Sequence, residues 1–106
     1  MEIEFVNAKT KKIAEIFRKA RKLYGKEKAE KIILRINELK AANTLKDIKN
    51  LPQARLHPLK INRRGQFSID TIRQYRIIIK PTGNYDINNL KTIKKIKILD
   101  LNLDTH

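Results

Sequence analysis

The sequence predicts an α+β fold with the element order β-α-α-β-β-β, in which two N-terminal helices pack on a mainly antiparallel sheet. Apolar residues recur at helical spacing over residues 9–42, whereas strand-like alternation occurs at the N-terminus and after residue 66. Helices that are grouped in sequence ahead of most strands are typical of the α+β class. A chain of 106 residues has the length of one domain, so we expect a single domain over residues 1–106.

The first half of the chain is predicted to contain one strand and two helices. Single apolar residues alternate with glutamates over residues 1–6, which predicts a strand with one exposed face. Two runs with apolar residues at helical spacing follow, over residues 9–23 and 26–42, and Gly25 favours the end of the first helix. The short link between the two runs predicts a helical hairpin.

The second half is predicted to contain one helical turn and three strands. Residues 44–47 have the Ser/Thr-x-x-acid pattern of a capping box, which predicts one turn of helix before Pro52. Alternation over residues 66–71 and β-branched residues over 74–80 predict two antiparallel strands joined by a short turn. A loop rich in Gly, Asn and Asp and a last strand follow, over residues 81–89 and 93–103.

The chain is strongly basic. It contains 25 Lys and Arg against 11 Asp and Glu, which gives a formal net charge of +14 at pH 7. Self-repulsion of this size predicts an acidic or polyanionic partner such as nucleic acid. No cysteine is present, which excludes disulfides, thiolate metal ligands and a cysteine nucleophile, and no apolar run is long enough to span a membrane. We therefore expect a cytoplasmic protein with no membrane partner.

The two histidines, His57 and His106, are candidates for general acid–base chemistry. Imidazole titrates near neutral pH, so a pair of imidazoles can supply both a base and an acid. The alternative interpretation is that His57 is an ordinary loop residue and His106 a frayed chain end. The spacing of the two residues leaves both interpretations open.

Arg76 interrupts the most apolar predicted strand. Alternation places it on the face that it shares with Ile78 and Lys80. A guanidinium on an inner strand face needs an anion to offset the cost of its desolvation. Asp70 on the neighbouring strand and a bound phosphate are both suitable anions.

Three segments carry a resemblance: residues 56–69, 75–77 and 104–106, with the sequences LHPLKINRRGQFSI, YRI and DTH. They are similar to HigB, the toxin of a type II toxin–antitoxin module in the RelE/ParE superfamily, and the similarity runs over essentially the whole chain. The resemblance implies a microbial ribonuclease-like sheet packed on two helices. It also implies a ribosome-dependent endoribonuclease that cuts mRNA without a metal or cofactor and is held inactive by a HigA-like antitoxin. DNA would be contacted only through the antitoxin complex.

The resemblance also implies roles for individual residues. In the implied mechanism a base removes the proton of an RNA 2′-OH, the oxygen attacks the adjacent phosphorus, and an acid protonates the leaving 5′-oxygen. The catalytic residues would be His57, His106, Asp104, Arg76 and Lys60. The expected RNA-binding residues are Arg55, Arg63, Arg64, Arg73, Lys80 and Thr105.

Two positions depart from the family pattern. The family's C-terminal tyrosine is Thr105 here, which removes a stacking ring, and Tyr75 or Phe67 would have to replace that ring. The family's usual glycine after the lysine of the motif is Ile61. Thr105 keeps a degraded toxin, surviving in a DNA-binding repressor complex, among the alternatives.

Two further alternatives share the basic charge or the fold. A non-catalytic RNA-binding or ribosome-binding protein is supported equally well by the charge, and it predicts binding that is indifferent to changes at His57. A poison of DNA gyrase, like the ParE toxins, would use the same fold. Such toxins generally lack the histidine pair, so His57 in its motif counts against a gyrase poison.

Overall fold

The computed structural model describes residues 1–105, so the expectations for His106 lie outside the described residues. Within residues 1–105 five strands form one sheet in the order β1-β5-β4-β3-β2. β1 pairs with β5 in parallel and the other neighbours are antiparallel, which confirms the predicted α+β fold with a mainly antiparallel sheet. The strands are β1 (Glu2–Phe5), β2 (His57–Pro58), β3 (Phe67–Asp70), β4 (Tyr75–Pro81) and β5 (Lys95–Asp104).

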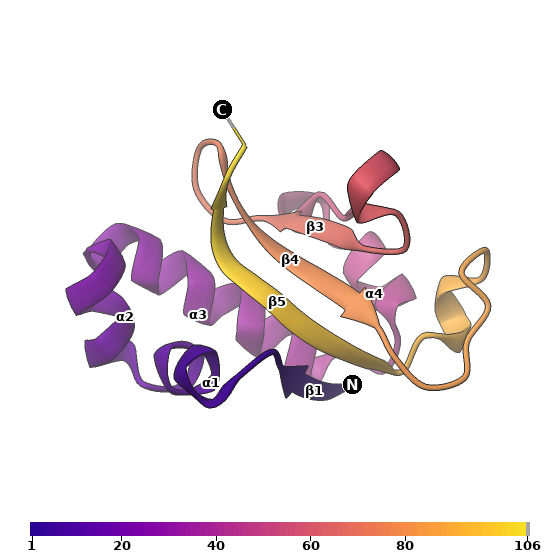
Figure 1. Cartoon of the computed structure of the whole chain (residues 1–106), viewed down its shortest axis with the longest axis horizontal. Helices are drawn as coiled ribbons and strands as arrows, with labels where there is room; N and C mark the ends of the chain where they lie inside the picture. The colour runs from indigo at the N-terminus through magenta and orange to yellow at the C-terminus, as the bar shows by residue number, and fades with distance from the viewer. Residues whose placement is uncertain (106) are drawn as a thin grey trace.

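The helices precede most of the sheet in sequence, and α3 and α4 lie behind it in the view of Figure 1. The first predicted helix is two helices, because Ile16 between α1 and α2 has an extended backbone, with φ −118° and ψ 100°. α1 contacts β1 and β5, whereas α2 packs along α3, so the bend lets one amphipathic segment cover different neighbours. The helices are α1 (Ala8–Glu15), α2 (Phe17–Tyr24), α3 (Lys26–Ala41) and α4 (Leu45–Lys49). No helix within residues 1–105 is long and apolar enough to cross a membrane.

The predicted helix end at Gly25 and the predicted capping box at residues 44–47 are confirmed. Gly25 ends α2 with a φ of 89°, a conformation that glycine adopts without steric cost. Asp47 in α4 accepts a hydrogen bond from the backbone N–H of Asn43 at 2.8 Å, and Thr44 completes the capping box. Three short 3-10 helices and the two-residue strand β2 were not predicted. The 3-10 helices are η1 (Pro52–Ala54), η2 (Ile61–Arg63) and η3 (Leu90–Thr92).

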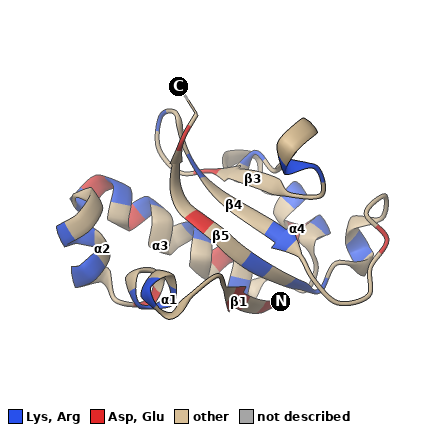
Figure 2. Cartoon of the chain, in the orientation of Figure 1, with Lys and Arg blue, Asp and Glu red and all other residues tan. Residues whose placement is uncertain are grey.

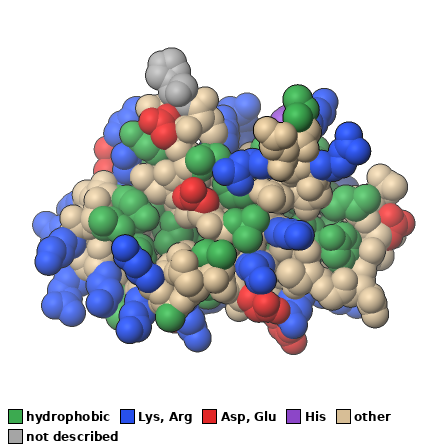
Figure 3. Space-filling view, viewed as in Figure 1, with side chains coloured by type: hydrophobic (Ala, Val, Ile, Leu, Met, Phe, Trp, Pro, Cys, Tyr) green, Lys and Arg blue, Asp and Glu red, His purple; other side chains and the backbone are tan. Residues whose placement is uncertain are grey.

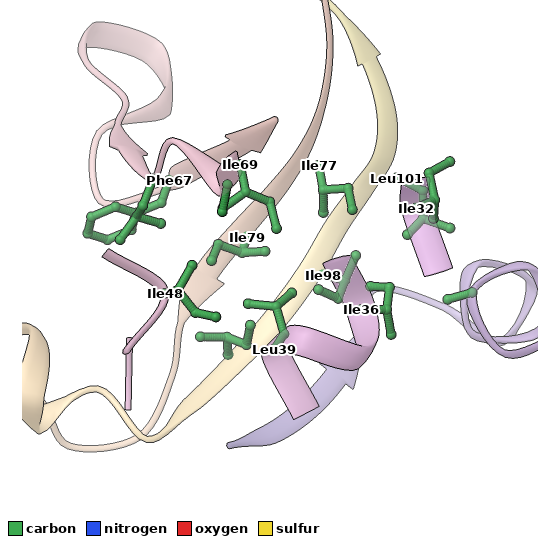
Figure 4. Close-up of a cluster of buried hydrophobic side chains, with 14 of the residues drawn as sticks. Ile32, Ile36, Leu39, Ile48, Phe67, Ile69, Ile77, Ile79, Ile98 and Leu101 are labelled. Atoms are coloured by element: carbon green, nitrogen blue, oxygen red, sulfur yellow. The ribbon is translucent and has the colours of Figure 1, made fainter. Parts of the chain in front are cut away.

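The hydrophobic core lies between the sheet and the helices α3 and α4. Figure 4 shows aliphatic side chains from both layers pointing toward one another. Removing such side chains from water is the main favourable contribution to folding, at about 25 cal/mol per Å² of apolar surface. The labelled core residues are Ile32, Ile36, Leu39, Ile48, Phe67, Ile69, Ile77, Ile79, Ile98 and Leu101.

A buried arginine joins α3 to two distant segments. Arg35 is 4% exposed, and its Nε donates a hydrogen bond to the carbonyl of Asp70 at 2.8 Å. Its Nη2 donates to the carbonyl of Gln53 at 3.1 Å, and its Nη1 donates to Oε1 of Glu38 at 2.9 Å. The guanidinium therefore ties α3 to η1 and to the end of β3.

We expect Arg35→Met to lower the free energy of unfolding by about 2–5 kcal/mol, because it leaves two carbonyls and Glu38 without their buried partner. Urea unfolding followed by circular dichroism measures this loss. Lys31→Met, on the exposed side of the same helix, is the matched control and should change stability by less than about 0.5 kcal/mol. An Arg35→Met protein as stable as the control would contradict the structural role of this guanidinium.

Candidate functional site

Strand register places the histidine motif on the face of the sheet that points away from the hydrophobic core, which we call the open face. His57 in β2 lies opposite Ser68 in β3, and Ser68 lies opposite Ile78 in β4. Residues directly opposite one another in an antiparallel sheet share a face. Ile77 and Ile79 belong to the core, so Ile78 and its cross-strand neighbours point to the other side. The alternation predicted for the strand that holds Arg76 and Ile78 is confirmed.

A cleft of about 410 Å³ opens on this face. Five residues singled out in the sequence meet here: His57, Arg55, Arg63, Arg76 and Thr105. They come from four separate parts of the chain, namely the segment around β2, the η2 helix, β4 and the end of β5. The remaining lining residues are Leu56, Leu59, Ser68, Ile78 and Leu103.

One carboxylate holds two of the cleft arginines. Arg76 forms an ion pair with Asp70, its neighbour on β3, and the other oxygen of that carboxylate lies 3.4 Å from Nη1 of Arg55. Of the two anions that suit Arg76, the structure shows Asp70. The side chain of Arg55 is 72% exposed and that of Arg76 is 25% exposed, so both guanidiniums can still be reached from the cleft. Two cations against one anion leave a local excess of positive charge.

Arg63 and Thr105, two further residues of the cleft lining, are held by hydrogen bonds. Nη1 of Arg63 donates to the side-chain oxygen of Gln66 at 3.1 Å, which directs a half-buried guanidinium. The hydroxyl of Thr105 donates to the carbonyl of Gln74 at 2.6 Å, and its backbone N–H donates to the same carbonyl at 3.1 Å. These bonds anchor the chain after β5 to the residue before β4.

Three further predicted residues lie close in sequence to cleft residues but do not line the cleft. Lys60 precedes η2 and Arg64 follows it, and both side chains are exposed. Asp104 ends β5 beside Thr105 and is also exposed. These residues are neighbours in sequence of cleft residues and are not part of the cleft lining.

Two predicted RNA contacts lie elsewhere. Lys80 is four residues beyond Arg76 on β4, about 13 Å along the strand, and lies opposite Lys97. Arg73 is at the tip of the β3–β4 hairpin, and its Nη1 lies 3.7 Å from the carboxylate of Glu27 on α3. Arg73 does not line the cleft, because the tip of the hairpin turns toward α3.

The two rings expected to replace the missing tyrosine do not reach the cleft. Tyr75 belongs to the helix-facing side of β4, and the ammonium of Lys28 on α3 lies 3.4 Å from the centre of its ring. Phe67 is only 4% exposed and forms part of the core. The expectation that Tyr75 or Phe67 supplies a stacking ring in this cleft is therefore wrong.

At the other end of this sheet face, Lys95 is paired with two glutamates. Nζ of Lys95 lies 2.9 Å from Oε1 of Glu4 and 3.7 Å from Oε2 of Glu2. The hydrogen bond with Lys95 lowers the pKa of Glu4, and the same bond raises the pKa of Lys95. Both groups therefore stay charged at neutral pH, and Lys95 already has anionic partners.

The backbone beside the cleft is left-handed at two residues other than glycine, Arg55 with φ 45° and Ile61 with φ 57°. This conformation is especially unfavourable for β-branched side chains. Ile61 is 84% exposed, so little packing offsets the cost. The sequence resemblance led us to expect glycine in place of Ile61, and the positive φ at this residue is a conformation that glycine adopts without steric cost.

A comparison with family models shows the family of the chain, and a comparison with solved structures shows its fold. Residues 4–106 match the model of the RelE-like HigB toxin of type II toxin–antitoxin systems. Among solved structures, the chain is similar to a YoeB/ParE toxin from Agrobacterium tumefaciens, with a TM-score of 0.54 and 14% sequence identity over 94% of each chain. At this level of identity the likeness shows the fold. No curated protein matches the sequence significantly.

We expect Asp70→Asn to strengthen the binding of inorganic phosphate to the cleft by roughly three- to tenfold, because it removes the anion that competes for Arg55 and Arg76. Phosphate titration monitored by the NMR shifts of the cleft residues measures the affinity. Glu27→Gln, which frees Arg73 outside the cleft, is the matched control and should leave this affinity unchanged. Equal effects of the two substitutions would show that the phosphate affinity follows net charge alone and not the pairing of Asp70 with the cleft arginines.

We expect Ile61→Gly to raise the free energy of unfolding by about 1 kcal/mol, because glycine adopts the positive φ without a steric cost. The change should leave the cleft lining intact, since Ile61 is not part of it. Thermal unfolding measures the gain. Ile87→Gly, at another exposed isoleucine whose φ is not positive, should not stabilise the protein. A destabilised Ile61→Gly protein would show that the exposed side chain makes a favourable contact.

Proposed function

Because the chain belongs to the RelE-like HigB toxins of type II toxin–antitoxin systems, we propose that it is a ribosome-dependent endoribonuclease that cuts mRNA and is neutralised by a HigA-like antitoxin. The observation that supports this proposal most directly is that His57 lines the same cleft as three arginines. A titratable imidazole next to fixed cations is suited to transfer protons at a phosphodiester. Translating ribosomes and mRNA place the proposed activity in the cytoplasm.

The proposed reaction uses the nucleophile that RNA itself carries. A base removes the proton of the 2′-OH, the 2′-oxygen attacks the adjacent phosphorus, and the 5′-oxygen leaves with a proton from an acid. The products are a 2′,3′-cyclic phosphate and a 5′-hydroxyl end. We assign the base and the acid to His57 and His106, with the carboxylate of Asp104 in support. The role of His106 rests on the sequence motif alone. DNA lacks the 2′-OH and is not cut.

The cations of the cleft would stabilise the charge that develops on the phosphorane. Arg76 is fixed by Asp70 before substrate arrives, and such preorganisation avoids reorganisation during the reaction. Arg55 and Arg63 would contact neighbouring phosphates. Lys60 on the exposed turn is proposed as a second catalytic cation. Arg64 and Lys80 are exposed cations that add salt-dependent attraction to RNA.

We expect His57→Ala to reduce single-turnover cleavage by about 10²–10⁴-fold, because it removes one half of an acid–base pair while net charge and binding barely change. Primer extension on a message in translating ribosomes measures the cleavage, at matched ribosome occupancy. Arg76→Ala should also be strongly impaired. Arg73→Ala, which removes an equal charge outside the cleft, is the matched control and should cut at nearly the wild-type rate.

The same experiment separates the proposed function from its alternatives. Naked RNA of the same sequence should be left intact, since a chain with few aromatic residues depends on the ribosome to hold the strand in line. Cleavage by His57→Ala at the wild-type rate would falsify the catalytic role of His57. Ribosome binding without any cleavage by the wild-type chain would identify a non-catalytic binding protein.

A further inference from the structure

α1 and α2 carry the same five-residue pattern. Residues 9–13 read KTKKI and residues 19–23 read KARKL, with lysine at the first and fourth positions and an aliphatic residue at the fifth. Positions i, i+3 and i+4 of an α-helix share one face. Each helix therefore presents a face with two lysines and one aliphatic side chain.

The bend at Ile16 turns these two faces toward a common groove. In one straight helix the patterns would lie about 15 Å apart and be rotated by about 80° relative to one another. In the structure they line a groove of about 490 Å³. Ile13 is buried at the base of this α1–α2 groove, while 55% of Leu23 is exposed. The lining residues are Lys9, Lys12, Ile13, Lys19, Lys22 and Leu23.

The lysines of the α1–α2 groove have no anionic partner within the described part of the chain. The ion pairs among residues 1–105 include none of the four. Glu15 is the sole acidic residue of the two helices, and it lies 3.6 Å from Lys40 on α3. Figure 2 marks Lys and Arg positions on α1 and α2, and Figure 3 shows Lys and Arg side chains gathered over this end of the molecule with hydrophobic side chains among them.

We propose that the α1–α2 groove is the docking site for an acidic amphipathic helix of the antitoxin. This inference rests on the antitoxin partner proposed above and is independent of the nuclease activity. An amphipathic helix would lay its apolar stripe on Ile13 and Leu23. Because lysines stand on both walls of the groove, the docked helix needs Asp or Glu on both flanks of that stripe.

The groove is better matched to such a helix than to RNA. A phosphate backbone would satisfy the lysines but would leave the aliphatic base of the groove uncovered. Base stacking would require an aromatic side chain, and the lining contains none. The groove also shares no lining residue with the cleft around His57, so a helix docked there engages a different surface from the proposed RNA site.

The test compares two charge reversals of equal size on the same helices. Lys12→Glu with Lys19→Glu changes the groove, and Lys11→Glu with Arg21→Glu changes residues outside its lining. The affinity of each full-length protein for the antitoxin encoded beside it is measured by isothermal titration calorimetry at physiological salt. We expect the groove pair to weaken binding by about tenfold or more and the outer pair to weaken it by less than about threefold. Circular dichroism confirms that both variants are folded.

The apolar part of the groove is tested with a second matched pair. Leu23→Asn removes an exposed leucine from the groove, and Leu34→Asn removes a comparably exposed leucine from α3, with exposures of 55% and 45%. We expect Leu23→Asn to weaken antitoxin binding by about fivefold or more and Leu34→Asn to leave it unchanged. Similar affinities for the two variants would contradict an apolar contact in the groove.

Each remaining outcome has a defined meaning. Equal weakening by the two charge reversals would overturn the inference, because affinity would then follow net charge alone. The inference would also be overturned if the Lys12→Glu, Lys19→Glu variant lost affinity for a 20-nucleotide RNA but kept its affinity for the antitoxin. That result would identify the groove as a nucleic-acid surface. If the wild-type chain fails to bind the antitoxin, both the proposed antitoxin partner and the proposed docking role of the groove are contradicted. Cleavage that depends on His57, measured separately on ribosomes, would still stand.

Discussion

The buried guanidinium of Arg35 is the constraint on which the geometry of the cleft depends. From the core side of α3 it donates hydrogen bonds to the carbonyls of Gln53 in η1 and Asp70 at the end of β3. η1 leads directly into the histidine motif, and the carboxylate of Asp70 holds Arg76. A buried charge without partners is costly, so folding must bring these acceptors to Arg35. The hydrogen bonds of Arg35 inside the core thereby place the segment that holds His57 near β4, which holds Arg76.

The rest of the positive charge is compensated unevenly over the surface. Arg73 and Lys95 have acidic neighbours at the hairpin tip and beside β1. In the cleft two guanidiniums share one carboxylate, and in the α1–α2 groove four ammonium groups have none within the described residues. Uncompensated charge attracts anionic partners where it is concentrated. The chain therefore presents two separate surfaces with different chemistry, a cleft with an imidazole and a groove with an aliphatic base.

The sequence was sufficient for those elements whose signal is periodic and local. The longer strands and α3 follow from alternation or helical spacing. The break at Ile16 has no glycine or proline to announce it, because packing against different neighbours causes it. β2 spans two residues, too few for alternation to be recognised. The sequence motif identified the candidate site residues, but the pairing register of the strands determines which of them line the cleft. Arg73 and Arg76 have the same chemistry, and Arg35 resembles any exposed helix arginine until its partners are known.

The carboxylate of Asp70 has a further consequence if a phosphodiester occupies the cleft. Asp70 already neutralises part of the charge on Arg55 and Arg76, so the singly charged ground state of RNA gains little from these cations. The phosphorane carries more negative charge on its oxygens, so the two arginines attract it more strongly than they attract the ground state, although the carboxylate also repels it more strongly. Catalysis depends on interactions that are stronger in the transition state than in the ground state. The same carboxylate holds Arg76 in position before RNA arrives, so under the proposed function its cost in attraction is offset by preorganisation of that cation.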